Sequence, residues 1–289
     1  MTVTTRPPAP AADALAAPRR RHPVRRVLVA IGVVLLLVLI AAGIWVVSYL
    51  TPDGPGEFFD DFDGAAGSAP DPKIWGNDVG RGGWGNNELQ EYTSDATALD
   101  GEGNLVITAT IPRDGSAITS GRLTTKGKFS FQYGTLETRM KLPGGQGLLP
   151  AFWMLGDTTD VVGWPAAGEI DIVETPSTTS ASSHHVHGPV SFTKKWSVGE
   201  GVRFERPLSE DYHVFGVTRS PGHIEITVDG EVAMTVDRDD IRKGTWVFDL
   251  PMHALFSLAV GGDWPGEPDE TTPEVAEMKI DWIRYTPQG

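Results

Sequence analysis

Cysteine is absent from the sequence, which excludes a disulfide framework, a thiolate metal site and a cysteine nucleophile. Basic side chains are scarce: 24 lysines and arginines stand against 38 aspartates and glutamates, and the net charge is −14. A nucleic-acid partner is not expected, because phosphate binding needs a concentrated basic surface. Tryptophan, in contrast, is abundant, with nine in 289 residues. Aromatic faces pack in cores, and they also bind sugars.

The charges are unevenly distributed along the chain. Residues 1–50 contain six arginines and one acid, Asp13, so they carry +5 and leave −19 on residues 51–289. The segment Val27–Leu50 has 24 residues and no charge. As a helix it would be roughly 36 Å long, enough to cross a hydrocarbon core of about 30 Å. We predict a transmembrane anchor at residues 27–50.

The arginines precede this apolar segment. The positive-inside rule therefore predicts a basic cytoplasmic N-terminus at residues 1–26 and an extracellular body, in a single-pass protein of the cell membrane. The alternative is secretion after cleavage of a signal peptide, whose apolar core is typically about 7–15 residues long. The observed segment is longer, and no A-x-A-like cleavage site follows it. These features favour the anchor.

The body begins after a turn-rich linker at residues 51–57, and one domain is predicted at residues 58–287. It shows no long helical stripe; short β-rich segments alternate with turns, and Asp229-Gly230 is typical of a tight hairpin. The pattern predicts an all-β fold, a β-sandwich jelly roll of two antiparallel sheets. Expected strands include Asn104–Ile111, Lys128–Tyr133, Thr135–Leu142, Glu169–Glu174 and His223–Val228.

Three carboxylates lie within one expected strand: Glu169, Asp171 and Glu174. In a regular strand the first two share a face and Glu174 points away, but one β-bulge returns Glu174 to the same face. Clustered carboxylates have separated pKa values, which suits glycoside hydrolysis by one nucleophile and one acid. The alternative is an acidic edge strand with solvated charges; the apolar neighbours at 170, 172 and 173 favour a buried strand.

Several segments of the body resemble the family-sixteen glycoside hydrolases, in particular their laminarinase-like branch of endo-1,3-β-glucanases. The segment at 164–174 (WPAAGEIDIVE) resembles the active-site strand of that branch, with its bulged E-x-D-x-x-E form. The other matching segments occur in the family's order: 85–90 (GNNELQ), 121–126 (GRLTTK), 142–147 (LPGGQG), 150–155 (PAFWML), 187–188 (HG), 228–230 (VDG), 259–266 (AVGGDWPG) and 280–284 (IDWIR).

The resemblance implies a jelly roll with a substrate cleft on its concave face. It also implies hydrolysis of internal β-1,3-glucosidic bonds by a retaining double displacement. Glu169 would be the nucleophile, Glu174 the acid/base, and Asp171 would lie between them, hydrogen-bonded to the nucleophile. Retention requires the two carboxyl groups to lie about 5–5.5 Å apart. No cofactor is needed for this chemistry.

Substrate-binding residues follow from the same matched segments. Tryptophans Trp84, Trp153, Trp164 and Trp264 are expected to stack on sugars. The alternative for each is core packing, which these large side chains also favour. The polar residues expected to bind sugar hydroxyls are Asn86, Glu88 and Arg122.

The histidine cluster at 184–187 (HHVH) raises a metal hypothesis, since imidazole is the commonest metal ligand. Its spacing matches no zinc signature. The resemblance instead implies that His187 lies beside the acid/base glutamate, and His184 and His185 are expected to be solvated.

A structural calcium ion away from the cleft is also implied by the resemblance. Asp281 matches a usual ligand, and Asp61 and Gly103 would complete the site. Calcium prefers six to eight oxygens, so the alternative is that Asp281 is an ordinary surface aspartate.

Alternative functions remain open from the sequence alone. The same carboxylates could act on a mixed-linkage glucan or a galactan, or transfer sugar to sugar as a transglycosylase. A carbohydrate-binding or sensor module is a different class; such relatives generally lose the catalytic glutamates, and this chain has both. We expect a monomer whose partners are a β-glucan and the membrane.

Overall fold

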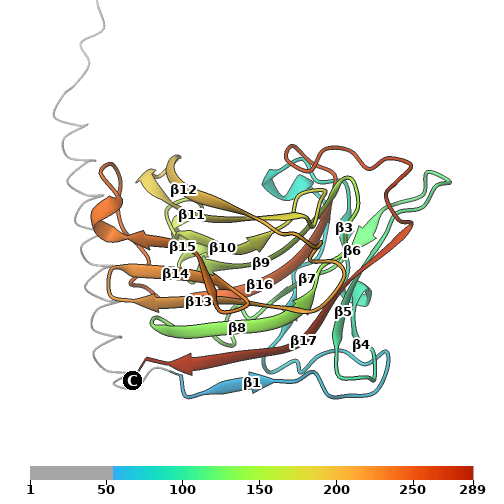
Figure 1. The fold of residues 1–289 in the computed structure, drawn as a ribbon, viewed down its shortest axis with the longest axis horizontal. Coiled ribbons are helices and arrows are strands. Elements are labelled where there is room, and N and C mark those ends of the chain that lie inside the picture. Colours follow the sequence, from blue (N-terminus) through green and yellow to red (C-terminus); the bar gives the residue numbers. More distant parts are fainter. Residues whose placement is uncertain (1–54, 289) are drawn as a thin grey trace, which may run out of the picture. The chain divides into compact units, whose positions relative to one another are not determined.

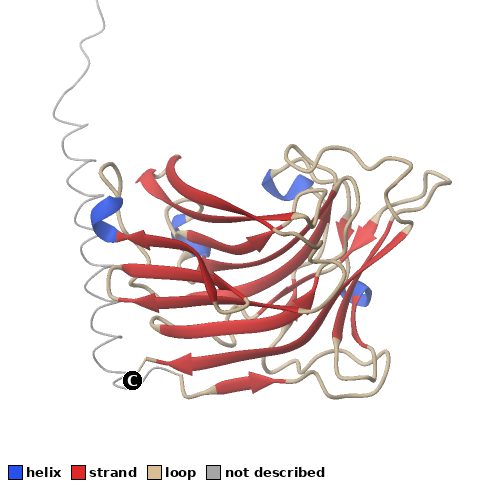
Figure 2. Ribbon diagram, viewed as in Figure 1, coloured by secondary structure: helices blue, strands red, loops and turns tan. Residues whose placement is uncertain are grey.

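The structure is a computed structural model that describes residues 55–288. The predicted cytoplasmic segment, the predicted anchor Val27–Leu50 and residues 51–54 of the linker lie outside the described residues. Within the described part, no helix is long and apolar enough to span a bilayer. Strands dominate this part of the chain (Figure 2), and the helical elements are short. They are η1 (Gly83–Gly85), η2 (Ser94–Ala96), α2 (Thr159–Val162) and η3 (Arg238–Asp240).

The strands form two sheets, as the all-β prediction requires (Figure 1). The larger sheet has ten strands. Its main order is β15 (Glu231–Asp237), β14 (His223–Val228), β13 (His213–Ser220), β8 (Gly134–Lys141), β17 (Val275–Pro287), β5 (Leu105–Thr110), β6 (Thr119–Ser120) and β3 (Glu91–Tyr92), with β1 (Phe58–Asp60) beside β17 and β4 (Thr97–Leu99) beside β5. Among the described strands, the β3–β6 pair is parallel and the other paired strands are antiparallel.

The smaller sheet carries the acidic segment, Glu169–Glu174, near its middle. Its seven strands follow the order β12 (Lys194–Arg203), β11 (Ala181–Ser191), β10 (Glu169–Glu174), β9 (Leu148–Gly156), β16 (Met252–Val260), β7 (Arg122–Thr124) and β2 (Gly76–Asn77).

The core lies between the two sheets. Strand β8 alternates buried and half-buried residues, as expected of a strand with one face on the core. Strand β16 is buried along its whole length and pairs with β9 and β7 on its two sides. Phe152 of β9 and Phe256 of β16 stack with ring centroids 4.8 Å apart, so aromatic packing joins these two strands next to β10.

Most strand expectations are confirmed. Asp229 and Gly230 both have positive φ and connect β14 to β15, as the hairpin pattern predicts. The strand expected at Lys128–Tyr133 is wrong: this segment forms turns and one isolated bridge, Phe131 to Met252. Phe131 is nevertheless fully buried, so its apolar character reflects core packing rather than a place in a sheet.

Candidate active site

The three carboxylates are brought to one face of β10 by a bulge. Asp171 is the register partner of His185 on β11, whereas Glu174 is the partner of Ser183, so β10 holds one extra residue between them. The pairing of β10 with β9 shifts at the same point. The bulge predicted from the sequence is therefore present, and it returns Glu174 to the face that carries Glu169.

The same bulge keeps the apolar residues of β10 inside. Ile170, Ile172 and Val173 are fully buried in the core. The acid side chains are only 18% (Glu169), 7% (Asp171) and 14% (Glu174) exposed. This segment is thus an interior strand and not a solvated edge, since it pairs with β9 on one side and β11 on the other.

Burial governs the ionisation of these acids. Loss of water and, after it, the charge of Asp171 raise the pKa of Glu169 to about 8. Burial and the charge of Glu169 likewise raise the pKa of Glu174 to about 8. The pKa of Asp171 is raised well above its usual range by burial and by Glu174. Because each carboxylate disfavours ionisation of a neighbour, the cluster retains protons at neutral pH, and one glutamate can be an acid beside an ionised partner.

Two histidines of β11 contact this cluster. His187 places Nε2 3.3 Å from Asp171 Oδ2 and 3.8 Å from Glu169 Oε1. Its Nδ1 lies 2.7 Å from Ser197 Oγ of β12. Burial lowers the pKa of His187 to about 4, so the imidazole is neutral at pH 7 and can donate a single N–H. An Nε2–H tautomer would donate to a carboxyl oxygen of Asp171 while Nδ1 accepts from the Ser197 hydroxyl.

The expectations for the neighbouring histidines need correction. His185, expected to be solvated, is the imidazole beside Glu174, with its Nδ1 3.3 Å from Glu174 Oε2. His187 is the cross-strand partner of Glu169 and does not lie where the resemblance implied. The antiparallel register explains the exchange, since the residue farther along β11 faces the start of β10.

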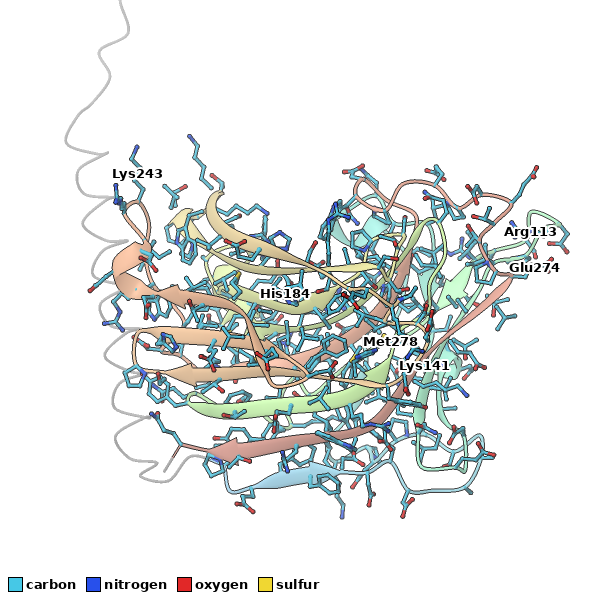
Figure 3. All side chains as sticks on the ribbon, viewed as in Figure 1. Arg113, Lys141, His184, Lys243, Glu274 and Met278 are labelled. Carbon is cyan, nitrogen blue, oxygen red and sulfur yellow. The ribbon has the colours of Figure 1, made fainter. Side chains whose placement is uncertain are left out.

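His184 is also not solvated. Its side chain is fully buried, with Nδ1 2.6 Å from the carbonyl oxygen of Ile172 and Nε2 2.8 Å from Ser182 Oγ. Figure 3 places it within the sandwich. Alternation along β11 accounts for this, because His184 points opposite to its neighbours in sequence.

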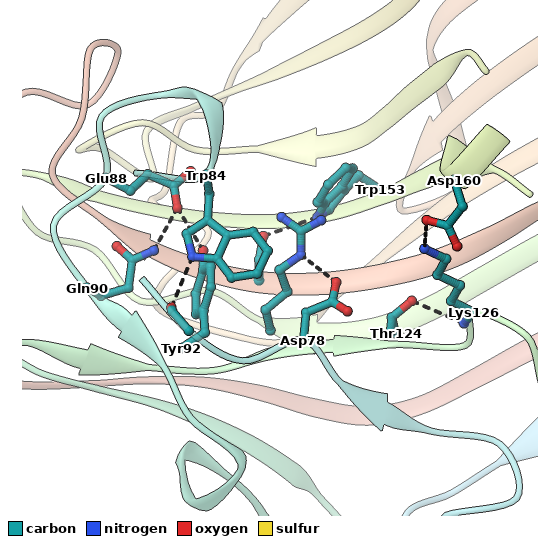
Figure 4. Close-up of polar contacts among 12 residues, drawn as sticks. Asp78, Trp84, Glu88, Gln90, Tyr92, Thr124, Lys126, Trp153 and Asp160 are labelled. Carbon is teal, nitrogen blue, oxygen red and sulfur yellow. Dashed lines mark hydrogen bonds and ion pairs between the residues drawn. The ribbon is translucent and has the colours of Figure 1, made fainter. Parts of the chain in front are cut away.

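On the other side of the cleft, Arg122 contacts two tryptophans, Trp84 and Trp153, and Figure 4 shows both indoles. Its guanidinium carbon is 4.8 Å from the ring centroid of Trp84 and 4.6 Å from that of Trp153. Asp78 accepts a hydrogen bond from Arg122 Nε at 3.0 Å, and Trp153 donates to Ser257 Oγ at 3.1 Å. The stack fixes both indoles by charge and hydrogen bonding, so their orientation does not depend on a bound sugar.

Glu88 is held by a second polar group beside this stack. Its Oε2 accepts hydrogen bonds from Gln90 at 2.6 Å and from the Tyr92 hydroxyl at 3.0 Å. Tyr92 also packs edge-on against Trp84, with ring centroids 5.2 Å apart. Burial raises the pKa of Glu88, and the two donors keep its carboxylate directed along the cleft wall.

One cleft of about 530 Å³ collects these groups, a size within the range of about 300–1,000 Å³ found for ligand sites. All the predicted catalytic and substrate-binding residues line it: Trp84, Asn86, Glu88, Arg122, Trp153, Trp164, Glu169, Asp171, Glu174, His187 and Trp264. The residues that sequence reasoning missed include Tyr92, Thr159, Lys195 and Ser257. Each comes from a strand or a short helix that lacks a catalytic motif of its own.

The main residue expected to bind calcium has another partner in the structure. Asp281 forms an ion pair with Arg139, which fits the alternative of a surface aspartate. The backbone oxygen of Asp61 lies 4.0 Å from the position a Cβ would take on Gly103, so these two are close. The calcium site stays a prediction.

Comparison with known proteins defines the class. Glycosyl hydrolases family 16 matches residues 86–284, and the chain belongs to this family. It is 37% identical to a beta-glucanase of Rhodothermus marinus over 243 residues, covering 78% of this chain and 82% of the relative. It is 36% identical to a glucan endo-1,3-beta-glucosidase of Cryptopygus antarcticus over 217 residues, which covers 67% of this chain and 77% of that protein.

A solved structure agrees with these relatives. The laminarinase catalytic domain of Thermotoga maritima MSB8 superposes with a TM-score of 0.73 at 37% identity, covering 82% of this chain and all of that domain. The resemblance to the laminarinase-like branch is thereby confirmed, and the chain is an O-glycosyl hydrolase of that branch.

The position of His185 gives a testable prediction. Gly199 is its cross-strand partner on β12, and a Cβ there would lie 2.2 Å from His185 Cδ2. Gly199→Ala should displace the imidazole from Glu174 and lower kcat about 10- to 100-fold with little change in KM, because the acid loses its orientation. Steady-state kinetics on a β-glucan measures both constants.

Gly201→Ala is the matched control. Its Cβ would meet only the Ser182 carbonyl, at 3.7 Å, an ordinary contact. Equal kcat values for the two variants would show that contact with His185 has no part in the activity.

Proposed function

We propose that this chain hydrolyses internal β-1,3-glucosidic bonds of β-glucans by a retaining double displacement. The observation that carries the proposal is the bulged β10, which places Glu169, Asp171 and Glu174 together on the cleft face. The relatives named above, described as a beta-glucanase, a glucan endo-1,3-beta-glucosidase and a laminarinase, support the substrate class.

In the first half-reaction, ionised Glu169 attacks the anomeric carbon of the sugar. Protonated Glu174 gives its proton to the glycosidic oxygen, so the bond to the leaving sugar breaks with charge balanced. The geometry supports this assignment: neutral His187 faces Glu169 and Asp171, whereas His185 faces Glu174.

In the second half-reaction, Glu174 accepts a proton from water, and the resulting hydroxide displaces Glu169 from the sugar. Asp171 lies between the glutamates and, when protonated, donates a hydrogen bond to Glu169, which stabilises the departing carboxylate. Carboxylates and water suffice for both steps, so we propose that the enzyme needs no cofactor. It acts as a monomer.

The sugar-binding surface supports a neutral polysaccharide substrate. Trp164 and Trp264 are 47% and 45% exposed, so their rings are open to stacking, unlike fully packed core aromatics. Trp84 and Trp153 flank Arg122 farther along the cleft. We propose that these four tryptophans mark sugar subsites and that Asn86, Glu88 and Arg122 bind hydroxyl groups.

Removal of the nucleophile should abolish hydrolysis. Glu169→Gln keeps the side-chain size but cannot form the glycosyl-enzyme, and kcat on laminarin should fall at least about 10³-fold. Released reducing ends are the measurement, with lichenan and agarose as competing substrates. Glu277→Gln, an exposed change on β17, should retain full activity. Wild-type turnover of agarose but not laminarin would contradict the proposed substrate.

The raised pKa of Glu169 predicts a pH-dependent stability. Its pKa of about 8 in the folded protein exceeds the ordinary 4.5. The folded state therefore loses stability as pH rises from below 4.5 through 8. Glu169→Gln removes this loss of stability. The Tm of the variant should therefore exceed that of the wild type at pH 8 but not at pH 4, by about 2–4 °C for each kcal/mol of stability recovered. Thermal denaturation at both pH values measures the difference, and an equal difference at both would refute it.

We also propose that residues 27–50 anchor the enzyme in the cell membrane, with the catalytic domain outside. The uncharged run and the arginines before it support this placement. Full-length protein should stay with membranes through a high-salt wash, enter solution only with detergent, and be digested by protease added to intact cells. A soluble secreted form that starts near Ala42 would favour signal cleavage instead.

A further inference from the structure

Lys195 is a charged cleft residue that the proposed mechanism leaves unused. Two cationic side chains line the described cleft, Arg122 and Lys195. Arg122 is already paired with Asp78. The lysine ion pairs of the described residues join Lys126 to Asp160 and Lys279 to Glu277, so Lys195 has no carboxylate within 4.0 Å. It is the cation of the cleft that remains free to balance the buried acids.

The fold holds this ammonium group beside the catalytic strand. Lys195 lies on the outer strand β12, opposite Pro189 of β11, and its Nζ is 5.1 Å from the ring centroid of Trp164. Trp164 in turn lowers the pKa of Glu169 by hydrogen bonding. One indole therefore lies beside the lysine in the cleft that also holds the expected nucleophile, so the cation and the carboxylate are neighbours in one site.

The other groups around the acids supply little positive charge. On β11, His187 is neutral at pH 7, because its pKa is lowered to about 4, and His185 faces Glu174. Across the cleft, Glu88 is hydrogen-bonded to Gln90 and Tyr92. In this setting the ammonium of Lys195 lowers the pKa of all three catalytic acids.

We propose that Lys195, held over Trp164 at the rim of the cleft, is a positioning residue whose positive charge offsets the mutual repulsion of the buried acids, so that one of the two glutamates can be ionised near neutral pH. The inference rests on the proposed function and adds the residue that balances the charge of its site. A role in binding an anionic sugar is disfavoured, because four carboxylates line the same cleft and residues 51–289 carry −19.

The pH profile of hydrolysis tests the proposal. Lys195→Gln should move both limbs of the kcat/KM profile on laminarin upward by about half a pH unit or more, which is roughly a threefold loss of rate at a fixed pH on the acidic limb. Lys195→Arg retains the charge and should restore the wild-type profile. Lys194→Gln is the matched control, since its side chain is on the opposite face of β12 and does not line the cleft.

Two results would overturn the proposal. The first is an unshifted profile in Lys195→Gln with a raised KM, which would make the lysine a substrate contact. The second is a loss confined to carboxymethylated β-glucan, with laminarin unaffected, which would make it an anion subsite.

A second measurement keeps the test independent of catalysis. Without the ammonium, the raised pKa values of the glutamates rise further, so Lys195→Gln should lose more Tm between pH 4 and pH 8 than wild type or Lys194→Gln. If no glucan is hydrolysed by the wild-type protein, the proposed function fails, and the Tm comparison still decides the electrostatic role. Parallel Tm curves for all three proteins would contradict that role.

Discussion

The bulge in β10 is the constraint on which the site depends. The strand must keep Ile170, Ile172 and Val173 in the core while its acids face the cleft, and strict alternation cannot satisfy both. One extra residue between Asp171 and Glu174 resolves the conflict. The pairing with β9 and β11 shifts at the same place, so the neighbouring strands hold the distortion. The position of the acid relative to the nucleophile is therefore a property of the sheet and not of a mobile loop.

Once the acids share a face, electrostatics limits what else can surround them. Burial raises the pKa of each carboxylate, which gives a proton to the acid but threatens the charge of the nucleophile. Neutral His187 can donate a hydrogen bond to Asp171 without adding a full charge. A distant cation such as Lys195 can then favour ionisation without forming a tight ion pair that would block attack. The negative charge of the acids therefore needs only weak compensation. His187 on β11 and Lys195 on β12 supply it.

The sequence predicted the parts of this arrangement that are encoded locally. Acid spacing indicated the bulge, the apolar residues between the acids indicated a buried strand, and short alternating segments indicated a sandwich. The partners of the acids were harder to assign, because cross-strand register decides them: His185 faces Glu174, and His187 faces Glu169. Lys195 could not be found from local pattern, since it reaches the cleft from β12, beyond β11. The prediction of a strand at Lys128–Tyr133 was wrong, because apolar residues that pack against the core can have the same sequence pattern as a strand.

The two walls of the cleft are stabilised in different ways, and this difference bears on how the enzyme can vary. The wall around Arg122 is a closed set of stacks and hydrogen bonds in which the guanidinium contacts Trp84, Trp153 and Asp78; a change there disturbs several partners at once. Lys195 lies on an exposed outer strand, and its described contact is the open face of Trp164. Its charge can therefore change without repacking the core. The ionisation of the acids can therefore change without a change in the geometry of the sugar subsites, although both affect the cleavage of the same glycosidic bond.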